Sequence, residues 1–238
     1  LRFTVEYHSI PEESFAGIIR NLHITNLNKS DVAFEGLDGL PLIIPFGIGN
    51  FGLKNIRRLM EAFVEVKNYD NKAPLFKAKV KPTDTPDVEV LERGNFYVGF
   101  ENSAKGMQIL TPIVDPERIF GAHNDYSYPD SFLSTPFDQL LDHQAFENRY
   151  PSAMGMFSKT LGAGETYTVS SVIGHAESQD ALNALLPSIM SKDYFSNKAQ
   201  DSIRIIEELT QKNLVVSREP VFDMYVRQNF LDNVLRGG

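Results

Sequence analysis

The sequence predicts a mainly β protein, namely an antiparallel β-sandwich with a C-terminal α-helical linker. Short stretches of alternating apolar residues recur between residues 1 and 174, and turn-forming residues separate them. From about Glu177 onward, apolar residues recur instead at the three- and four-residue spacing of helices. We therefore expect a β-sandwich domain at residues 1–174 and a helical linker at residues 175–238.

The strands of the first part are predicted from apolar alternation and from turn residues at their ends. The resulting set is residues 3–7, 18–24, 32–36, 62–67, 75–80, 88–92, 96–101, 107–114, 153–161 and 166–173.

Four segments between these strands need separate interpretation. Residues 37–47 contain two prolines, which cannot donate to a sheet ladder, and so indicate an edge strand or an ordered loop. Residues 53–63 have helical spacing and predict one short helix. Residues 115–150 have few periodic apolar positions and predict a long ordered loop or an element without a pattern. The Gly-Ala-Gly-Glu sequence at 162–165 predicts a hairpin turn.

The second part predicts three helices. Apolar residues form one stripe at residues 182–189 and another at residues 199–209. The third helix begins near Pro220, a residue that is favoured in the first turn, and it is apolar on more than one side. Such a helix is normally buried, so we expect it to pack against the β domain or against a further C-terminal domain.

Charge and cysteine content exclude several classes of function. The 23 Lys and Arg against 31 Asp and Glu give a net charge of −8, which argues against nucleic acid and anionic membranes as partners. With no cysteine, the chain has no disulfide, thiolate zinc site or cysteine nucleophile. We expect a cytoplasmic protein. Export stays open, because a chain that begins at Leu1 inside a strand pattern indicates that its native N-terminus is missing.

The sequence assigns no catalytic residue, metal site or cofactor. The five histidines at 8, 23, 123, 143 and 175 do not have the spacing of metal ligands. The glycines at 47–52 and 162–164 superficially match nucleotide-binding loops, but no parallel βαβ pattern surrounds them, so turns are the better interpretation. The many acidic residues do not single out a catalytic pair.

Two groups of residues are candidates for contact with a sugar or a phosphate. The first is on the third helix, where amides, a carboxylate and arginines suit hydroxyls and oxyanions; the competing interpretation is a solvated helix face with charges at the helix end. The second is in the irregular loop, where His123, Tyr126 and Tyr128 either contact ligand or stabilise the loop. The helical candidates are Arg227, Gln228, Asn229, Asp232, Asn233 and Arg236.

Four segments resemble a known family. They are LDGLPLIIPFG at 37–47, ERGNFYVGF at 92–100, LGAGETYTVSSVIGHAES at 161–178 and YVRQNFLDNVLRGG at 225–238. Together they resemble large bacterial proteins of the cellobiose-phosphorylase-like family of glycoside phosphorylases and hydrolases. The resemblance extends over most of the chain.

This resemblance implies a galactose-mutarotase-like β-supersandwich and linker helices, which in the family precede a catalytic (α/α) barrel. The family's general-acid carboxylate lies in that barrel and has no matching position here. The implied function is the non-catalytic N-terminal part of a carbohydrate-active enzyme, which scaffolds or shapes the sugar site and mediates oligomerisation. The implied partners are an oligosaccharide or sugar phosphate, the catalytic domain and a second copy in a homodimer, with inorganic phosphate as a co-substrate of the whole enzyme.

Two alternatives come from other classes of protein. One is a stand-alone carbohydrate-binding module, against which the absence of tryptophan counts mildly. The other is a structural dimerisation domain.

Overall fold

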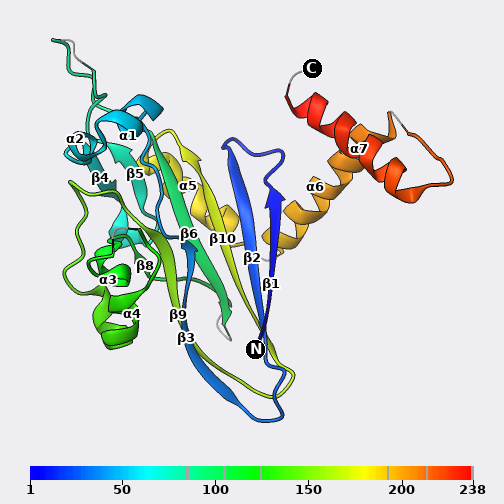
Figure 1. The fold of residues 1–238 in the computed structure, drawn as a ribbon, viewed down its shortest axis with the longest axis horizontal. Helices are drawn as coiled ribbons and strands as arrows, with labels where there is room; N and C mark the ends of the chain where they lie inside the picture. Colours follow the sequence, from blue (N-terminus) through cyan, green and yellow to red (C-terminus); the bar gives the residue numbers. More distant parts are fainter. Residues whose placement is uncertain (84–85, 104–105, 124, 192, 213, 237–238) are drawn as a thin grey trace.

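The computed structural model describes residues 1–83, 86–103, 106–123, 125–191, 193–212 and 214–236. In this part of the chain the strands form two antiparallel sheets (Figure 1). The larger sheet has seven strands, in the order β1 (Arg2–Ser9), β2 (Gly17–Thr25), β10 (Thr166–Ala176), β6 (Gly94–Ser103), β5 (Leu75–Ala78) and β4 (Val64–Lys67), with β7 (Gly106–Ile109) paired to β6. The smaller sheet has three, in the order β3 (Val32–Leu40), β9 (Ala153–Leu161) and β8 (Pro112–Ile113).

Helices and strands occupy similar shares of the described residues. The antiparallel sheets were expected. The protein is not mainly β, however, because it contains about as much helix as strand. The difference comes partly from short helices within residues 50–141, because elements of one or two turns leave almost no periodicity in the sequence. The described helices include none that is long and apolar enough to cross a membrane.

The two sheets share an apolar cluster. Leu22 and Ile24 of β2 and Val169 of β10 pack with Phe157 and Leu161 of β9. Because side chains on a strand alternate between faces, every second residue of β2 and β10 points toward the smaller sheet. This face of the larger sheet is therefore part of the core.

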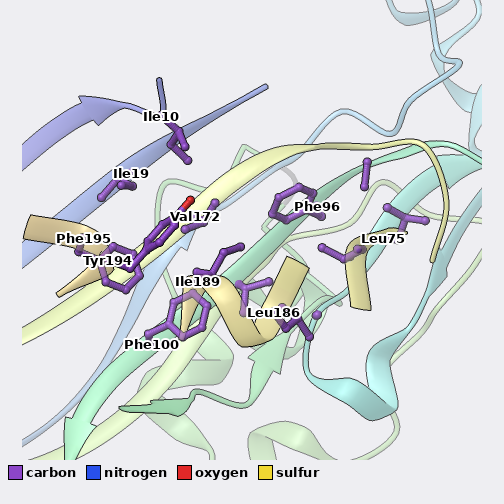
Figure 2. Close-up of a cluster of buried hydrophobic side chains, with 14 residues drawn as sticks. Ile10, Ile19, Leu75, Phe96, Phe100, Val172, Leu186, Ile189, Tyr194 and Phe195 are labelled. Atoms are coloured by element: carbon purple, nitrogen blue, oxygen red, sulfur yellow. The ribbon is translucent and has the colours of Figure 1, made fainter. Parts of the chain in front are cut away.

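The opposite face of the larger sheet is covered by α5 (Gln179–Ile189) and by the start of α6 (Tyr194–Gln211). Figure 2 shows Leu186 and Ile189 of α5 among the buried side chains of this layer, with Phe96 and Phe100 of β6 and Val172 of β10. Ser178 caps α5, since its hydroxyl accepts a hydrogen bond from the Ala181 amide at 3.1 Å.

The chain passes between the sheets at two adjacent corners. We expected residues 162–165 to join a hairpin, and this is wrong: β9 pairs with β3 and β8, whereas β10 pairs with β2 and β6. The turn after β9 instead lies beside the turn after β2. Asn26 connects the two turns through its backbone. Its backbone N–H donates to the carbonyl of Glu165 at 2.9 Å, and its backbone carbonyl accepts from the N–H of Gly164 at 3.0 Å.

The single helix expected at 53–63 is divided into α1 (Asn50–Asn55) and α2 (Arg57–Glu61). Ile56 separates them with φ −137° and ψ 37°, outside the helical region. The break brings Met60 against Gly52, where an added Cβ would lie 2.7 Å from Met60 Cγ. Gly52 therefore allows the two short helices to pack closely.

Residues 115–150 contain three short helices that the sequence pattern did not reveal. These are α3 (Glu117–Phe120), α4 (Asp130–Ser134) and the 3-10 helix η2 (Phe137–Leu141); another 3-10 helix, η1 (Tyr69–Asn71), follows β4. The three helices within residues 115–150 cover the smaller sheet, where Ile119, Phe120 and Leu140 pack with Met156 of β9. By contrast, the strand expected at residues 88–92 is reduced to one bridge between Val80 and Val90.

The last helix is α7 (Pro220–Leu235), which packs against α6 and extends away from the sheets (Figure 1). No described residue of α7 is buried. Its exposed apolar side chains include Val221, Phe222, Met224, Tyr225 and Leu235. A helix that is apolar on several sides is thus left largely uncovered.

Candidate ligand-binding site

A polar pocket of about 320 Å³ lies between α2, α3 and the segment that precedes β9. Three separate stretches of chain supply its walls, and among them are three arginines and two glutamates. The lining residues are Arg57, Arg58, Glu61, Pro116, Glu117, Gly121, His123, Tyr126, Asn148, Arg149 and Tyr150.

Arg149 is fixed by two carboxylates. Its Nη1 is 2.7 Å from Asp115 Oδ1 and also contacts the carboxylate of Glu117. Asp115 is buried and is held in turn by the backbone amides of Ala145 at 3.0 Å and Glu117 at 3.1 Å. Burial alone would lower the pKa of Arg149, but the hydrogen bonds and charges of Asp115 and Glu117 raise it above its ordinary value. Arg149 is therefore a fixed cation at the pocket wall.

Arg57 is in a different situation, because it forms no ion pair with any described residue. Its guanidinium lies over the ring of Tyr150, with Cζ 5.2 Å from the ring centroid. The Tyr150 hydroxyl donates a hydrogen bond of 3.4 Å to the carbonyl of Arg57. Burial raises the pKa of Tyr150, and the charge of Arg57 acts in the opposite direction. The guanidinium of Arg57 is thus positioned by stacking while its donors stay available to a ligand.

Arg58 and Glu61 form the remaining charged pair. Arg58 Nη1 lies 3.3 Å from Glu61 Oε2, and the Arg58 side chain is 81% exposed. A surface ion pair of this kind contributes little to stability, but it engages the Glu61 carboxylate.

The pocket contains two of the loop residues that the sequence singled out, His123 and Tyr126. Tyr126 has a positive φ of 56° and packs edge-on against Phe120 at 5.1 Å. The ring of His123 lies 5.9 Å from that of Tyr128, which is half exposed. Tyr126 therefore packs the loop and lines the pocket at once, so the two interpretations of this loop are compatible.

The helical candidates lie elsewhere. Five are on α7 and Arg236 follows its last residue; α7 lies at the opposite end of the molecule from α3 (Figure 1). Arg227 Nε donates to Thr210 Oγ1 at 2.8 Å and fastens α7 to α6, while Arg236 pairs with Asp232 at 3.1 Å. Gln228, Asn229 and Asn233 are exposed. None of the six lines the pocket of His123 and Tyr126.

Sequence reasoning missed the arginines of this pocket. The Arg57-Arg58 pair lies within the helix expected at 53–63, where the pattern does not distinguish it from an ordinary exposed helix face. The neighbouring Arg149-Tyr150 pair lies more than ninety residues away along the chain. Only the tertiary fold brings Arg57 over Tyr150.

The pocket can bind a ligand that combines hydroxyl groups with an anionic group. Guanidinium groups recognise phosphate and carboxylate oxygens, and Asn148, His123 and Glu61 offer donors and acceptors for hydroxyls. Among the described residues, no group of three or more His, Asp or Glu side chains is placed to hold a metal ion.

No family model matches the chain, and no curated protein matches it significantly.

Proposed function

We propose that the chain is the non-catalytic β part of a carbohydrate-active enzyme of the glycoside phosphorylase or hydrolase type. In this role it shapes the sugar-binding site and binds a sugar or sugar phosphate in the pocket of Arg57. Inorganic phosphate is then a co-substrate of the whole enzyme. The resemblance of the four sequence segments to the cellobiose-phosphorylase-like family supports the same assignment.

One observation carries this proposal, namely the pairing of charges in the pocket. Both lining carboxylates are engaged by arginines, Glu61 by Arg58 and Glu117 by Arg149. Arg57, by contrast, has no carboxylate partner among the described residues. Both lining carboxylates are thus already paired, while one guanidinium stays open to an anionic group of a ligand. The pocket is therefore suited to holding an anionic sugar.

We also propose that the two sheets form a β-sandwich of the galactose-mutarotase-like supersandwich type. The apolar cluster shared by β2, β10 and β9 supports this arrangement. Further support comes from Tyr97 of β6, whose hydroxyl donates to Asp38 O of β3 at 2.7 Å and accepts from the Gly155 amide of β9 at 2.9 Å. Residues 1–174 are then the sandwich domain and residues 175–238 the linker.

The exposed apolar side chains of α7 support a role as an arm that packs against a larger catalytic body. Phe222 is 52% exposed and Leu235 is 73% exposed. Exposed apolar groups that gather on one element are typical of interaction sites. This feature favours a part of a larger enzyme over a stand-alone carbohydrate-binding module, which has no use for such an arm.

The pocket is tested by titration calorimetry with glucose 1-phosphate. We expect the wild-type chain to bind and the Arg57→Ala variant to bind at least about tenfold more weakly, because a charge-assisted hydrogen bond is worth about 1.5–3 kcal/mol. Arg57 is exposed, so the variant is expected to keep its melting temperature.

The matched control is Arg218→Ala, which removes an exposed arginine outside the pocket and is expected to leave binding unchanged. Equal affinity of the wild type and Arg57→Ala, or no binding by the wild type, would contradict the proposed site.

A structural dimerisation domain is a second candidate function, and strand β1 favours it. β1 is an edge strand of the larger sheet, and Phe3, Val5 and Tyr7 are exposed on one of its faces. A long apolar edge strand is a template for pairing with another strand. If the chain is a dimerisation domain, we expect light scattering to show a dimer at micromolar concentrations. A monomer at all concentrations would contradict this second function.

A further inference from the structure

A second and larger cavity, a groove of about 970 Å³, lies on the other side of the larger sheet from the smaller sheet. Its floor is formed by β1, β2 and β10, and its walls by the first turns of α6, the end of β6 and the start of β7. No residue of this groove belongs to the pocket of Arg57. The groove is thus a separate candidate site.

The floor of the groove is a ladder of polar pairs between β2 and β10. Asn21 is paired in register with Ser170, whose hydroxyl donates to Asn21 Oδ1 at 2.7 Å. Two residues further along, His23 Nδ1 lies 2.9 Å from Thr168 Oγ1. Because residues two apart on a strand share a face, all four side chains point toward the groove.

Asn21 is the most informative of these residues. It is only 9% exposed, and its Nδ2 donors have no hydrogen-bond partner among the described residues. Nδ2 is not among the buried side-chain atoms of the described residues that lack a partner, so it is accessible to solvent. Since Asn21 lines the groove, a ligand in the groove can accept a hydrogen bond from Nδ2.

The charges of the groove differ from those of the first pocket. Glu6 lies between two imidazoles, with its Oε2 3.7 Å from His8 Nε2 and 3.5 Å from His23 Nε2. Asp193 is a second lining carboxylate, and the described lining contains no lysine or arginine. This lining disfavours a phosphorylated ligand and suits a neutral one with many hydroxyl groups.

The wall opposite the polar floor is apolar. Met107, Met190 and Phe195 contribute to it, and Phe195 is held against Phe100 with ring centroids 5.4 Å apart. Sugars combine apolar CH faces with a rim of hydroxyls, and such ligands need one apolar wall and convergent polar groups.

The groove is preformed, because several contacts fix α6 against the sheet. Lys198 pairs with Glu13 at 2.9 Å, and the Tyr194 hydroxyl lies 3.3 Å from the same carboxylate. Ser9 Oγ and Ser202 Oγ are 2.8 Å apart. Figure 2 shows Tyr194 and Phe195 among the buried side chains of the α5 and α6 layer. Little ordering is then required when a ligand binds.

We propose that this groove binds a neutral oligosaccharide through Asn21, His23, Thr168 and Ser170, independently of the Arg57 pocket. The two sites divide ligands by charge: the arginine pocket takes the anionic sugar and the groove takes the neutral one.

The test is titration calorimetry with cellotetraose and laminaritetraose on the wild-type chain and on two groove variants, Thr168→Val and His23→Ala. Thr168→Val keeps the shape of the side chain and removes the hydroxyl. We expect at least one of the two tetrasaccharides to bind the wild type and each variant to weaken that binding about tenfold or more, with an unchanged melting temperature.

The matched control is Thr166→Val. Thr166 lies two residues before Thr168 on the same face of β10 and pairs with Thr25, but it does not line the groove. This variant is expected to bind like the wild type, as is Arg57→Ala. Absence of binding to both tetrasaccharides, or equal binding by the groove variants, would overturn this inference. Weaker tetrasaccharide binding in Arg57→Ala alone would assign neutral sugars to the first pocket and also overturn it. None of these outcomes affects the test of the Arg57 pocket, which uses glucose 1-phosphate.

Discussion

Asn26 is the residue on which the connection between the two sheets depends most. It is fully buried, and its Nδ2 donates to three backbone carbonyls, those of Ser30 at 2.9 Å, Leu161 at 2.9 Å and Gly162 at 3.0 Å. Its Oδ1 accepts from the Asn28 amide at 3.0 Å. One side chain therefore satisfies backbone groups of both corners.

Replacing Asn26 with alanine leaves buried carbonyls without a donor. Because each unsatisfied buried group costs about 1–3 kcal/mol, we expect Asn26→Ala to lower the free energy of unfolding by about 2–4 kcal/mol in urea denaturation. Asn28→Ala is the matched control, since the Asn28 side chain is exposed, and it should change the free energy by less than about 0.5 kcal/mol. A small effect of Asn26→Ala would show that the corners are held by other contacts.

Arg57 and Asn21 are the two best candidate site residues. In each, the fold fixes the side chain, while its N–H donors stay open to a ligand. Arg57 is stacked on Tyr150, and Asn21 is bonded through its oxygen to Ser170. Neither could be selected from the sequence, because an arginine at a helix start and an asparagine in a strand are both ordinary. Their partners became visible only with the tertiary contacts.

At the scale of elements, α7 differs from the other long helices. Phe195 of α6 is 9% exposed and packs on Phe100, whereas Phe222 of α7 is 52% exposed. The sequence correctly predicted a helix from Pro220 that is apolar on several sides. It could not tell whether the β domain covers this helix, because amphipathic periodicity identifies an apolar face without identifying its neighbour.

We expect these two phenylalanines to respond differently to truncation. Phe195→Ala opens a cavity in the core and should lower the free energy of unfolding by about 3 kcal/mol. Phe222→Ala should change it by less than about 0.5 kcal/mol, since the ring touches little of this chain. Urea denaturation of both variants measures the difference. Equal losses would mean that α7 is packed within the chain, which would remove the support for an arm.

For the whole molecule, the long strands and helices could be predicted, but their assembly could not. The bounds of β9, residues 153–161, are those expected from the sequence. The assignment of β9 and β10 to different sheets could not be predicted, because the turn at 162–165 suits a hairpin as well as a corner. The helices within 115–150 were missed, because each is too short to show a period.

The fold places two candidate sites of different charge on one chain. Three arginines and two glutamates line the smaller pocket, whereas two carboxylates and neutral polar groups, without lysine or arginine, line the larger groove. Within the proposed function, the chain holds sugars for a catalytic body that packs against α7. Binding without cleavage is the central property of such a part.

Nuclear magnetic resonance on a single sample tests this property most directly. The chain is mixed with cellobiose, inorganic phosphate and glucose 1-phosphate, and saturation transfer and the anomeric signals are followed over time. We expect saturation to pass from the protein to the glucose 1-phosphate protons while all anomeric signals keep their intensities. Absence of transfer, or cellobiose loss with growth of free glucose in proportion to chain concentration, would contradict it.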